Sequence, residues 1–178
     1  NNKPGVDNTY YNVSFAAGAS WHLSHRALLR ANIASAYRAP NIAELTQNGL
    51  HGDRYEEGNT DLAAQRSYEA DLSMHYHSEY ATFDIAGFYN SINNYIYLTQ
   101  TNDTTGNGYL IYKYSQTNAY LYGIETGMNI YPAGWLNFIV TYANVVGRQQ
   151  DENYLPFIPQ DKLKIETQCK KQSFSFIN

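Results

Sequence analysis

The chain has 178 residues and a formal net charge of −4, with 16% charged and 15% aromatic residues, including 18 tyrosines. A net negative chain without a basic stripe argues against a nucleic-acid backbone as partner, because few phosphate counterions would be released. No stretch approaches the roughly 20 apolar residues of a membrane helix, and the mean hydropathy is −0.53. Cys169 is the single cysteine, so an intrachain disulfide is excluded. Strands that are half polar would reconcile the aromatic content with the low hydropathy.

The segment from Tyr68 to His77 alternates strictly between two kinds of residue. One set is apolar or aromatic: Tyr68, Ala70, Leu72, Met74 and Tyr76. The other set is polar: Glu69, Asp71, Ser73, His75 and His77. A period of two predicts a β-strand with one apolar and one polar face.

The same alternation recurs along the chain and predicts about seven strands. In chain order they cover residues 11–24, 27–38, 67–78, 81–98, 109–130, 135–146 and 162–176. Segments this long exceed the five or six residues usual for a strand of a soluble sandwich. No linker or domain boundary divides them, so residues 1–178 are expected to belong to one domain.

The connections between these segments are of two lengths. Short turns lie at residues 25–26, 79–80 and 132–134, whereas residues 39–66, 99–108 and 147–161 form longer loops. An antiparallel up-and-down meander puts all short turns at one end and all long loops at the other, as in outer-membrane barrels. Aromatic residues beside the short turns suit an interfacial girdle: Trp21, Tyr80, Tyr131 and Trp135. We therefore predict an all-β fold, an arc of a larger transmembrane β-barrel.

In such a barrel the two faces of each strand meet different surroundings. An unpaired charge facing lipid is costly, so the apolar set is expected on the lipid side and the charged set on the lumen side. The lipid-side set is Val13, Phe15, Leu72, Met74, Phe83, Ile85, Ile124, Met128, Phe138, Val140, Leu163 and Ile165. The lumen-side set is Glu69, Asp71, His75, Asp84, Glu125, Lys164 and Glu166.

Several short motifs resemble those of TonB-dependent outer-membrane receptors. Arg38-Ala39-Pro40, followed by Glu44-Leu45, is similar to the family's R-A-P…E-L segment. Further matches follow in the family's order: Gly58-Asn59-Thr60-Asp61-Leu62, Ser67-Tyr68-Glu69, Gly123-Ile124-Glu125 and Leu155-Pro156-Phe157-Ile158-Pro159. The chain departs from the family pattern at Thr60, where Pro is usual, and at Gln65, where Glu is usual.

The resemblance implies an active transporter in the outer membrane of a Gram-negative bacterium. Its ligand would be a large or scarce nutrient, namely a ferric siderophore, haem, cobalamin or a glycan. Family barrels have about 22 strands, so the resemblance also implies an N-terminal plug, further strands and TonB contact outside this chain. This segment would supply barrel wall and extracellular loops, with lipid and a small-molecule or glycan ligand as partners.

Aromatic and basic residues of the long loops are the candidate ligand contacts. Tyrosine faces suit sugars, porphyrins and catecholates alike, and arginines suit anionic iron complexes. Tyrosines at the rim also suit the lipid interface, and the arginines equally suit the plug or internal carboxylates. The candidate set is Arg38, Arg54, Tyr55, Tyr109, Tyr112, Tyr114 and Tyr154.

Neither a metal site nor an active site is predicted. His75 and His77 share a strand face with Glu69 and Asp71, which permits a metal site, but wet lumen-facing residues give the same pattern. No nucleophile elbow, zinc-binding helix motif or phosphate loop is found. The chain is therefore not expected to be an enzyme or to bind a cofactor.

Two other readings remain open from the residues alone. A soluble all-β carbohydrate-binding module would use the tyrosines as a platform, and a passive outer-membrane porin would have the same strands without TonB. Both ends of the chain look cut from something larger. An isolated arc would have two unpaired edges and an outward apolar face, so we expect it to associate or aggregate without detergent.

Overall fold

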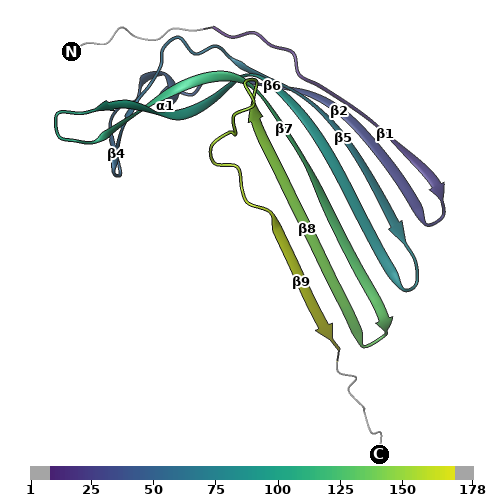
Figure 1. Cartoon of the computed structure of the whole chain (residues 1–178). Helices are drawn as coiled ribbons and strands as arrows, with labels where there is room; N and C mark the ends of the chain where they lie inside the picture. The colour runs from purple at the N-terminus through teal and green to yellow at the C-terminus, as the bar shows by residue number, and fades with distance from the viewer. Residues whose placement is uncertain (1–8, 171–178) are drawn as a thin grey trace, which may run out of the picture.

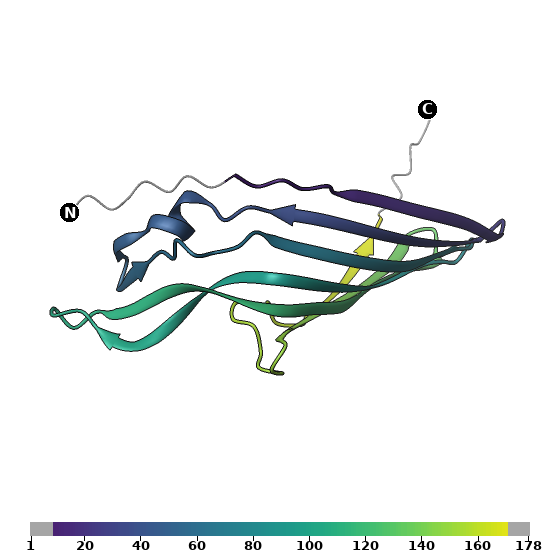
Figure 2. The same cartoon turned by 90° about the horizontal axis from the view of Figure 1, so that it is seen from above.

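The computed structural model describes residues 9–170, in which one nine-stranded sheet and one short helix are found. The elements in chain order are β1 (Phe15–Ser24), β2 (Ala27–Arg38), α1 (Ile42–Thr46), β3 (Asn48–His51), β4 (Arg54–Glu57), β5 (Gln65–His77), β6 (Ala81–Thr104), β7 (Leu110–Ala133), β8 (Leu136–Gln149) and β9 (Lys162–Cys169). Figures 1 and 2 show a single curved, twisted layer. Helix α1 lacks the length and apolar character to cross a membrane, and it is the only helix within residues 9–170.

Seven of the nine strands in the described part of the chain form the predicted meander. Neighbours pair antiparallel in the order β1, β2, β5, β6, β7, β8 and β9. The short turns lie together at one end of the sheet, and the long connections lie at the other (Figure 1). The prediction of an antiparallel up-and-down arc is confirmed.

Several strand boundaries differ from the prediction, among them the start of β1 and the end of β6. Strand β1 begins at Phe15, and residues 11–14 are not part of a strand. The expected loop at 99–108 is mostly strand, because β6 runs to Thr104 and β7 starts at Leu110. Residues 99–104 are all polar, so the alternation stops there although the strand continues, with a register shift between Gln100 and Thr104. The predicted end of the last strand lies partly outside the described residues.

The expectation that every strand pair is antiparallel is wrong for β4. Residues Tyr55–Glu57 of β4 pair in parallel with Ile111–Lys113 of β7. Strand β8 pairs with β7 only from Ala119 onward. The β7 residues before Ala119 therefore have no β8 partner, and their edge facing away from β6 is open there. An open edge has unpaired N–H and C=O groups, and β4 of the β3–β4 hairpin covers it.

The register confirms that the two predicted residue sets occupy opposite faces. Directly opposed residues share a face, and one row runs across five strands: His75, Asp84, Gly127, Thr141 and Lys164. The adjacent row contains Met74, Ile85, Thr126, Tyr142 and Leu163. The charged face is the concave one, because a single hollow is lined by Arg30, His75, Asp84, Glu125 and Lys164. Val13 precedes β1 and is outside this register.

The outer face of β5 has aromatic residues at both ends of an apolar stretch. Nine residues run from Tyr68 to Tyr76, with Leu72 in the middle at 55% exposure. A barrel strand needs about 9–11 residues to cross a membrane. Near the upper end, the rings of Tyr89 and Tyr122 both stack on Tyr120, with centroids 6.3 Å apart. On β5, tyrosines therefore lie at both ends of an apolar band whose length matches that of a membrane-spanning barrel strand.

Candidate ligand-binding site

Residues 39–64 fold against the extended end of the β6–β7 hairpin, residues 93–118, and together they are called the loop assembly here. The assembly lies at the end of the sheet opposite the short turns (Figure 1). Leu45, Leu62 and Ile96 form its buried centre, with exposures of 8%, 3% and 7%, and Tyr114 packs against them. Burial raises the pKa of Tyr114, and the nearby carboxylates of Glu56 and Glu44 act in the same direction.

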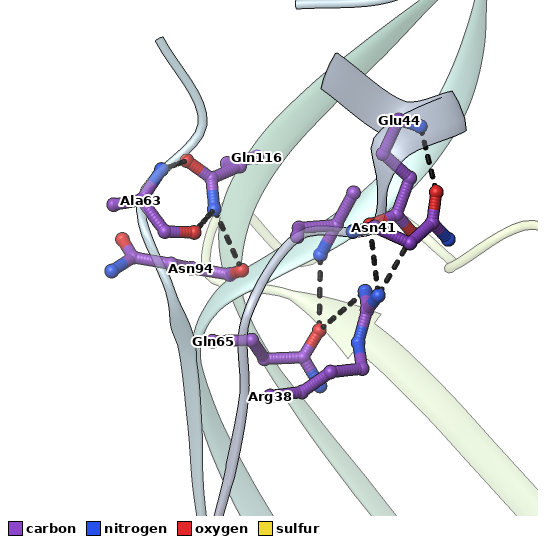
Figure 3. Close-up of polar contacts among 8 residues, drawn as sticks. Arg38, Asn41, Glu44, Ala63, Gln65, Asn94 and Gln116 are labelled. Carbon is purple, nitrogen blue, oxygen red and sulfur yellow. Dashed lines mark hydrogen bonds and ion pairs between the residues drawn. The ribbon is translucent and has the colours of Figure 1, made fainter. Parts of the chain in front are cut away.

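Arg38 joins the top of β2 to α1 and β5 (Figure 3). Its Nη1 donates to both carboxylate oxygens of Glu44, at 2.8 and 2.9 Å, and its Nη2 donates to Oε1 of Gln65 at 3.3 Å. Glu44 also accepts from the backbone N–H of Asn41, whose side chain accepts from the Glu44 N–H. This reciprocal capping box satisfies two donors at the helix start. The Arg-Ala-Pro…Glu-Leu motif thus fixes the start of α1 to the ends of β2 and β5; this set of bonds is called the Arg38 clamp here.

The Gly-Asn motif holds the returning chain against the other end of α1. Gly58 donates its N–H to the carbonyl of Gln47 at 2.7 Å, and Asn59 donates its N–H to that of Glu44 at 2.8 Å. A Cβ on Gly58 would come within 2.6 Å of the Leu45 carbonyl carbon, so the position requires glycine. The Asn59 Nδ2 then donates across to the Tyr114 carbonyl of β7 at 3.2 Å.

Gln116 of β7 provides a second link to the loop, one that no sequence motif indicated. Its Oε1 accepts from the Ala63 N–H at 2.8 Å, and its Nε2 donates to the Ala63 carbonyl at 2.6 Å (Figure 3). The same Nε2 donates to the Asn94 carbonyl at 3.1 Å. The side-chain amide therefore pairs with Ala63 as a neighbouring strand would.

Three of the candidate ligand residues belong to the β4–β7 ladder, where Arg54 and Tyr112 share one face and Tyr55 lies on the other. Arg54 donates from Nε to Glu56 at 2.7 Å, and its guanidinium carbon lies 5.3 Å from the centroid of the Tyr112 ring. The hydrogen bond to Glu56 raises the pKa of Arg54. Tyr55 donates its hydroxyl to Asn48 at 3.1 Å and is directly opposite Ile111 in the ladder.

The other four candidates have different positions. Arg38 and Tyr114 are engaged inside the loop assembly. Tyr109 is 37% exposed, next to the first residue of β7 at the hairpin tip. Tyr154 is 68% exposed on the separate loop after β8, where the Arg148 guanidinium lies 4.4 Å from its ring centroid.

Basic residues at this end of the sheet are paired with carboxylates of the same chain. The pairs are Arg38–Glu44 at 2.8 Å, Arg54–Glu56 at 2.7 Å, Lys113–Glu57 at 3.0 Å and Arg148–Glu152 at 3.5 Å. Arg66 instead donates to the uncharged Asn12 and Tyr68. Most of the basic side chains at this end that could attract an anionic ligand are therefore already neutralised by carboxylates of this chain.

On the concave face, His75 and Asp84 are directly opposed on β5 and β6. The His75 Nδ1 lies 2.6 Å from an Asp84 carboxylate oxygen. Across residues 9–170, no three histidine, cysteine or acidic side chains are grouped closely enough to hold a metal ion.

Comparison with known proteins agrees with this architecture. Solved structures with similar folds include the copper transporter OprC (TM-score 0.73, 18% identity, 85% of this chain and 23% of that one). The ferric enterobactin receptor PfeA in complex with BCV-L6 matches with TM-score 0.70 and 22% identity, over 90% of this chain and 26% of that one. The siderophore receptor PirA from Pseudomonas aeruginosa matches with TM-score 0.65 and 22% identity, over 78% and 28%.

This chain thus spans about a quarter of the length of these receptors. At these identities the likeness shows the fold. The family assignment comes from the sequence, because residues 1–168 match the family described as TonB dependent receptor-like, beta-barrel. The chain belongs to the TonB-dependent receptor β-barrel family.

Proposed function

We propose that this chain is part of an outer-membrane receptor of a Gram-negative bacterium that takes up a large or scarce nutrient with energy supplied through TonB. The family match over residues 1–168 carries this proposal. Residues 1–178 would form part of a single transmembrane barrel, with the plug, the TonB contact and the remaining strands supplied by other parts of the receptor. The outer face would contact lipid and the loop assembly would face outward.

The ligand is proposed to be a metal complex or another bulky nutrient bound at the extracellular end. The structural neighbours include proteins named for copper, siderophores and ferric enterobactin. Within this chain, Arg54 and Tyr112 would contact the ligand on one face of the β4–β7 ladder, and Tyr55 would contact it from the other face. Tyr109 and Tyr154 would approach it from the hairpin tip and the neighbouring loop. Arg38 and Tyr114 would act on the ligand through the fold of the loop assembly. No catalytic step is proposed.

The test uses the full-length receptor in a Gram-negative strain without its own siderophore receptors. Cells are supplied with radiolabelled ferric enterobactin, other ferric siderophores, haem, cobalamin or copper, with and without an intact tonB gene. We expect accumulation of at least one of these ligands only when TonB is present. Equal accumulation without TonB would favour a passive porin, and a soluble product outside the membrane fraction would favour a carbohydrate-binding module.

A matched pair of variants tests the site. Tyr112 lies opposite Gln100, and Tyr97 lies opposite Ser115, so the two tyrosines occupy different faces of the hairpin. Tyr112→Ala should weaken ligand binding by about tenfold, the scale of one lost aromatic and cation–π contact. Tyr97→Ala should change affinity by less than about twofold. Similar losses in both variants would argue against this surface.

A further inference from the structure

The loop of residues 39–64 is attached to the β6–β7 hairpin at several separate places. The attachments are the buried cluster around Leu62 and Ile96, the Asn59–Tyr114 bond, the Gln116–Ala63 pair and the β4–β7 ladder. The two side-chain attachments join residues 55 and 53 positions apart in sequence. Such links restrain the loop at points that local structure alone would leave free.

The ladder between β4 and β7 is short and depends on its surroundings. It contains three residue pairs, from Tyr55–Ile111 to Glu57–Lys113, and the last pair also forms an ion pair at 3.0 Å. An isolated two-stranded hairpin such as β3–β4 is at best marginally stable in water. The ladder therefore needs the bonds of Asn59 and Gln116 to keep β4 in register.

The Arg54–Tyr112 contact bridges the two parts of the loop assembly. Arg54 belongs to β4 and Tyr112 to β7, and the guanidinium stays 5.3 Å from the ring centroid only while β4 is docked. Any ligand that contacts both side chains requires the docked arrangement. Residues that hold β4 against β7 then influence ligand affinity without touching the ligand.

We propose that residues 39–64 and the β6–β7 hairpin form one rigid platform, in which Asn59 and Gln116 are positioning residues and which stays assembled when ligand binds. The role in ligand binding rests on the proposed function. The rigidity itself is a property of the unliganded receptor and can be measured separately.

The first experiment follows backbone hydrogen exchange of residues 54–57 in the full-length receptor in detergent micelles, without ligand. Gln116→Ala removes three hydrogen bonds between side chain and backbone, and should speed this exchange about tenfold or more. Gln168→Ala is the matched control and should leave this exchange unchanged, because Gln168 accepts from Asn137 of β8 at the other end of the sheet. Unchanged exchange in Gln116→Ala would overturn the positioning role.

The second experiment joins β4 to β7 with a disulfide bond in the Gln116→Ala variant. Glu57 and Lys113 are ladder partners, so their Cα atoms lie in the range that a disulfide can span. Glu57→Cys and Lys113→Cys are combined with Cys169→Ser, which removes the native thiol. Oxidation should return the exchange of residues 54–56 in Gln116→Ala to the wild-type rate, and reduction should abolish this rescue. Failure of the oxidised form to rescue would contradict a role in positioning.

The same double-cysteine receptor, with Gln116 retained, separates a rigid platform from a moving gate. Ferric enterobactin binding and uptake are measured in the oxidised and reduced states. A rigid platform predicts values within about twofold of each other. Binding without uptake, reversed by reduction, would show that the platform must open and would overturn the inference. A receptor that takes up none of the ligands named above counts against the proposed function, whereas the exchange results still decide rigidity.

Discussion

Gly58 lies against the carbonyl carbon of Leu45 so closely that a Cβ at Gly58 would come within 2.6 Å of it. The backbone of the returning loop thereby touches the last turn of α1. The contact connects the Arg-Ala-Pro…Glu-Leu motif with the Gly-Asn motif, which are adjacent in space at the start of the loop assembly.

Gly58→Ala should loosen residues 39–64. The added methyl group must displace backbone rather than a flexible side chain, and overpacking of this kind costs about 1–3 kcal/mol. We expect protease cleavage within residues 39–64 of the full-length receptor to become about tenfold faster. Gly49→Ala is the control, since a Cβ at Gly49 meets no atom within 4 Å. Equal cleavage rates in the two variants would contradict the close-approach explanation.

Arg38→Ala should weaken the start of α1. Glu44 is 8% exposed and would lose two charge-assisted hydrogen bonds while remaining largely desolvated. The expected cost to local stability is about 1–3 kcal/mol, and hydrogen exchange at the amides of Leu45 and Gln47 measures it. Arg38→Lys keeps the charge but has one nitrogen instead of the two that reach Glu44 and Gln65, and it should give an intermediate rate. An unchanged rate in Arg38→Ala would rule out the Arg38 clamp.

Leu72→Lys should impair folding into the membrane. Leu72 is midway between Tyr68 and Tyr76 on the outer face, where a lysine costs about 2–4 kcal/mol. Ala86→Lys is a control at similar depth, because Ala86 lies opposite Glu125 on the concave face and neighbours the partner of Leu72, Gly87. Chemical denaturation of the full-length receptor in lipid vesicles should show the larger loss for Leu72→Lys. The reverse order would invalidate the assignment of faces.

Alkaline pH should undock the loop assembly. Burial raises the pKa of Tyr114 above its ordinary value of 10.0, so the folded state retains this proton where the unfolded segment loses it. The resulting stabilisation is complete below the unfolded pKa and is lost as pH rises through the folded pKa. Protease cleavage of residues 39–64 should therefore accelerate above about pH 10. In Tyr114→Phe the acceleration should be smaller, and an identical pH profile would exclude Tyr114 as its source.

The alternation of residues was sufficient to predict the meander. A strand presents successive side chains to opposite faces, so the pattern around Leu72 and His75 encodes both the strand and its two environments without reference to distant residues. The family motifs indicated the resemblance to receptor barrels, whereas the packing of these segments against one another was decided by the structure. Strand ends were less accurate, because the polar residues 99–104 lack the alternation that would have predicted a longer hairpin.

The partners of the loop residues were decided by the tertiary structure. Gln116 and Ala63 are 53 residues apart, and their contact uses backbone groups that every residue except proline has. The parallel pairing of β4 with β7 likewise depends on an open strand edge created where β8 stops. Local sequence determines which face a side chain occupies, because that is fixed by backbone period. Only the folded chain determines which distant groups satisfy one another, because hydrogen-bonding groups are common to nearly all residues and their pairing depends on position in space.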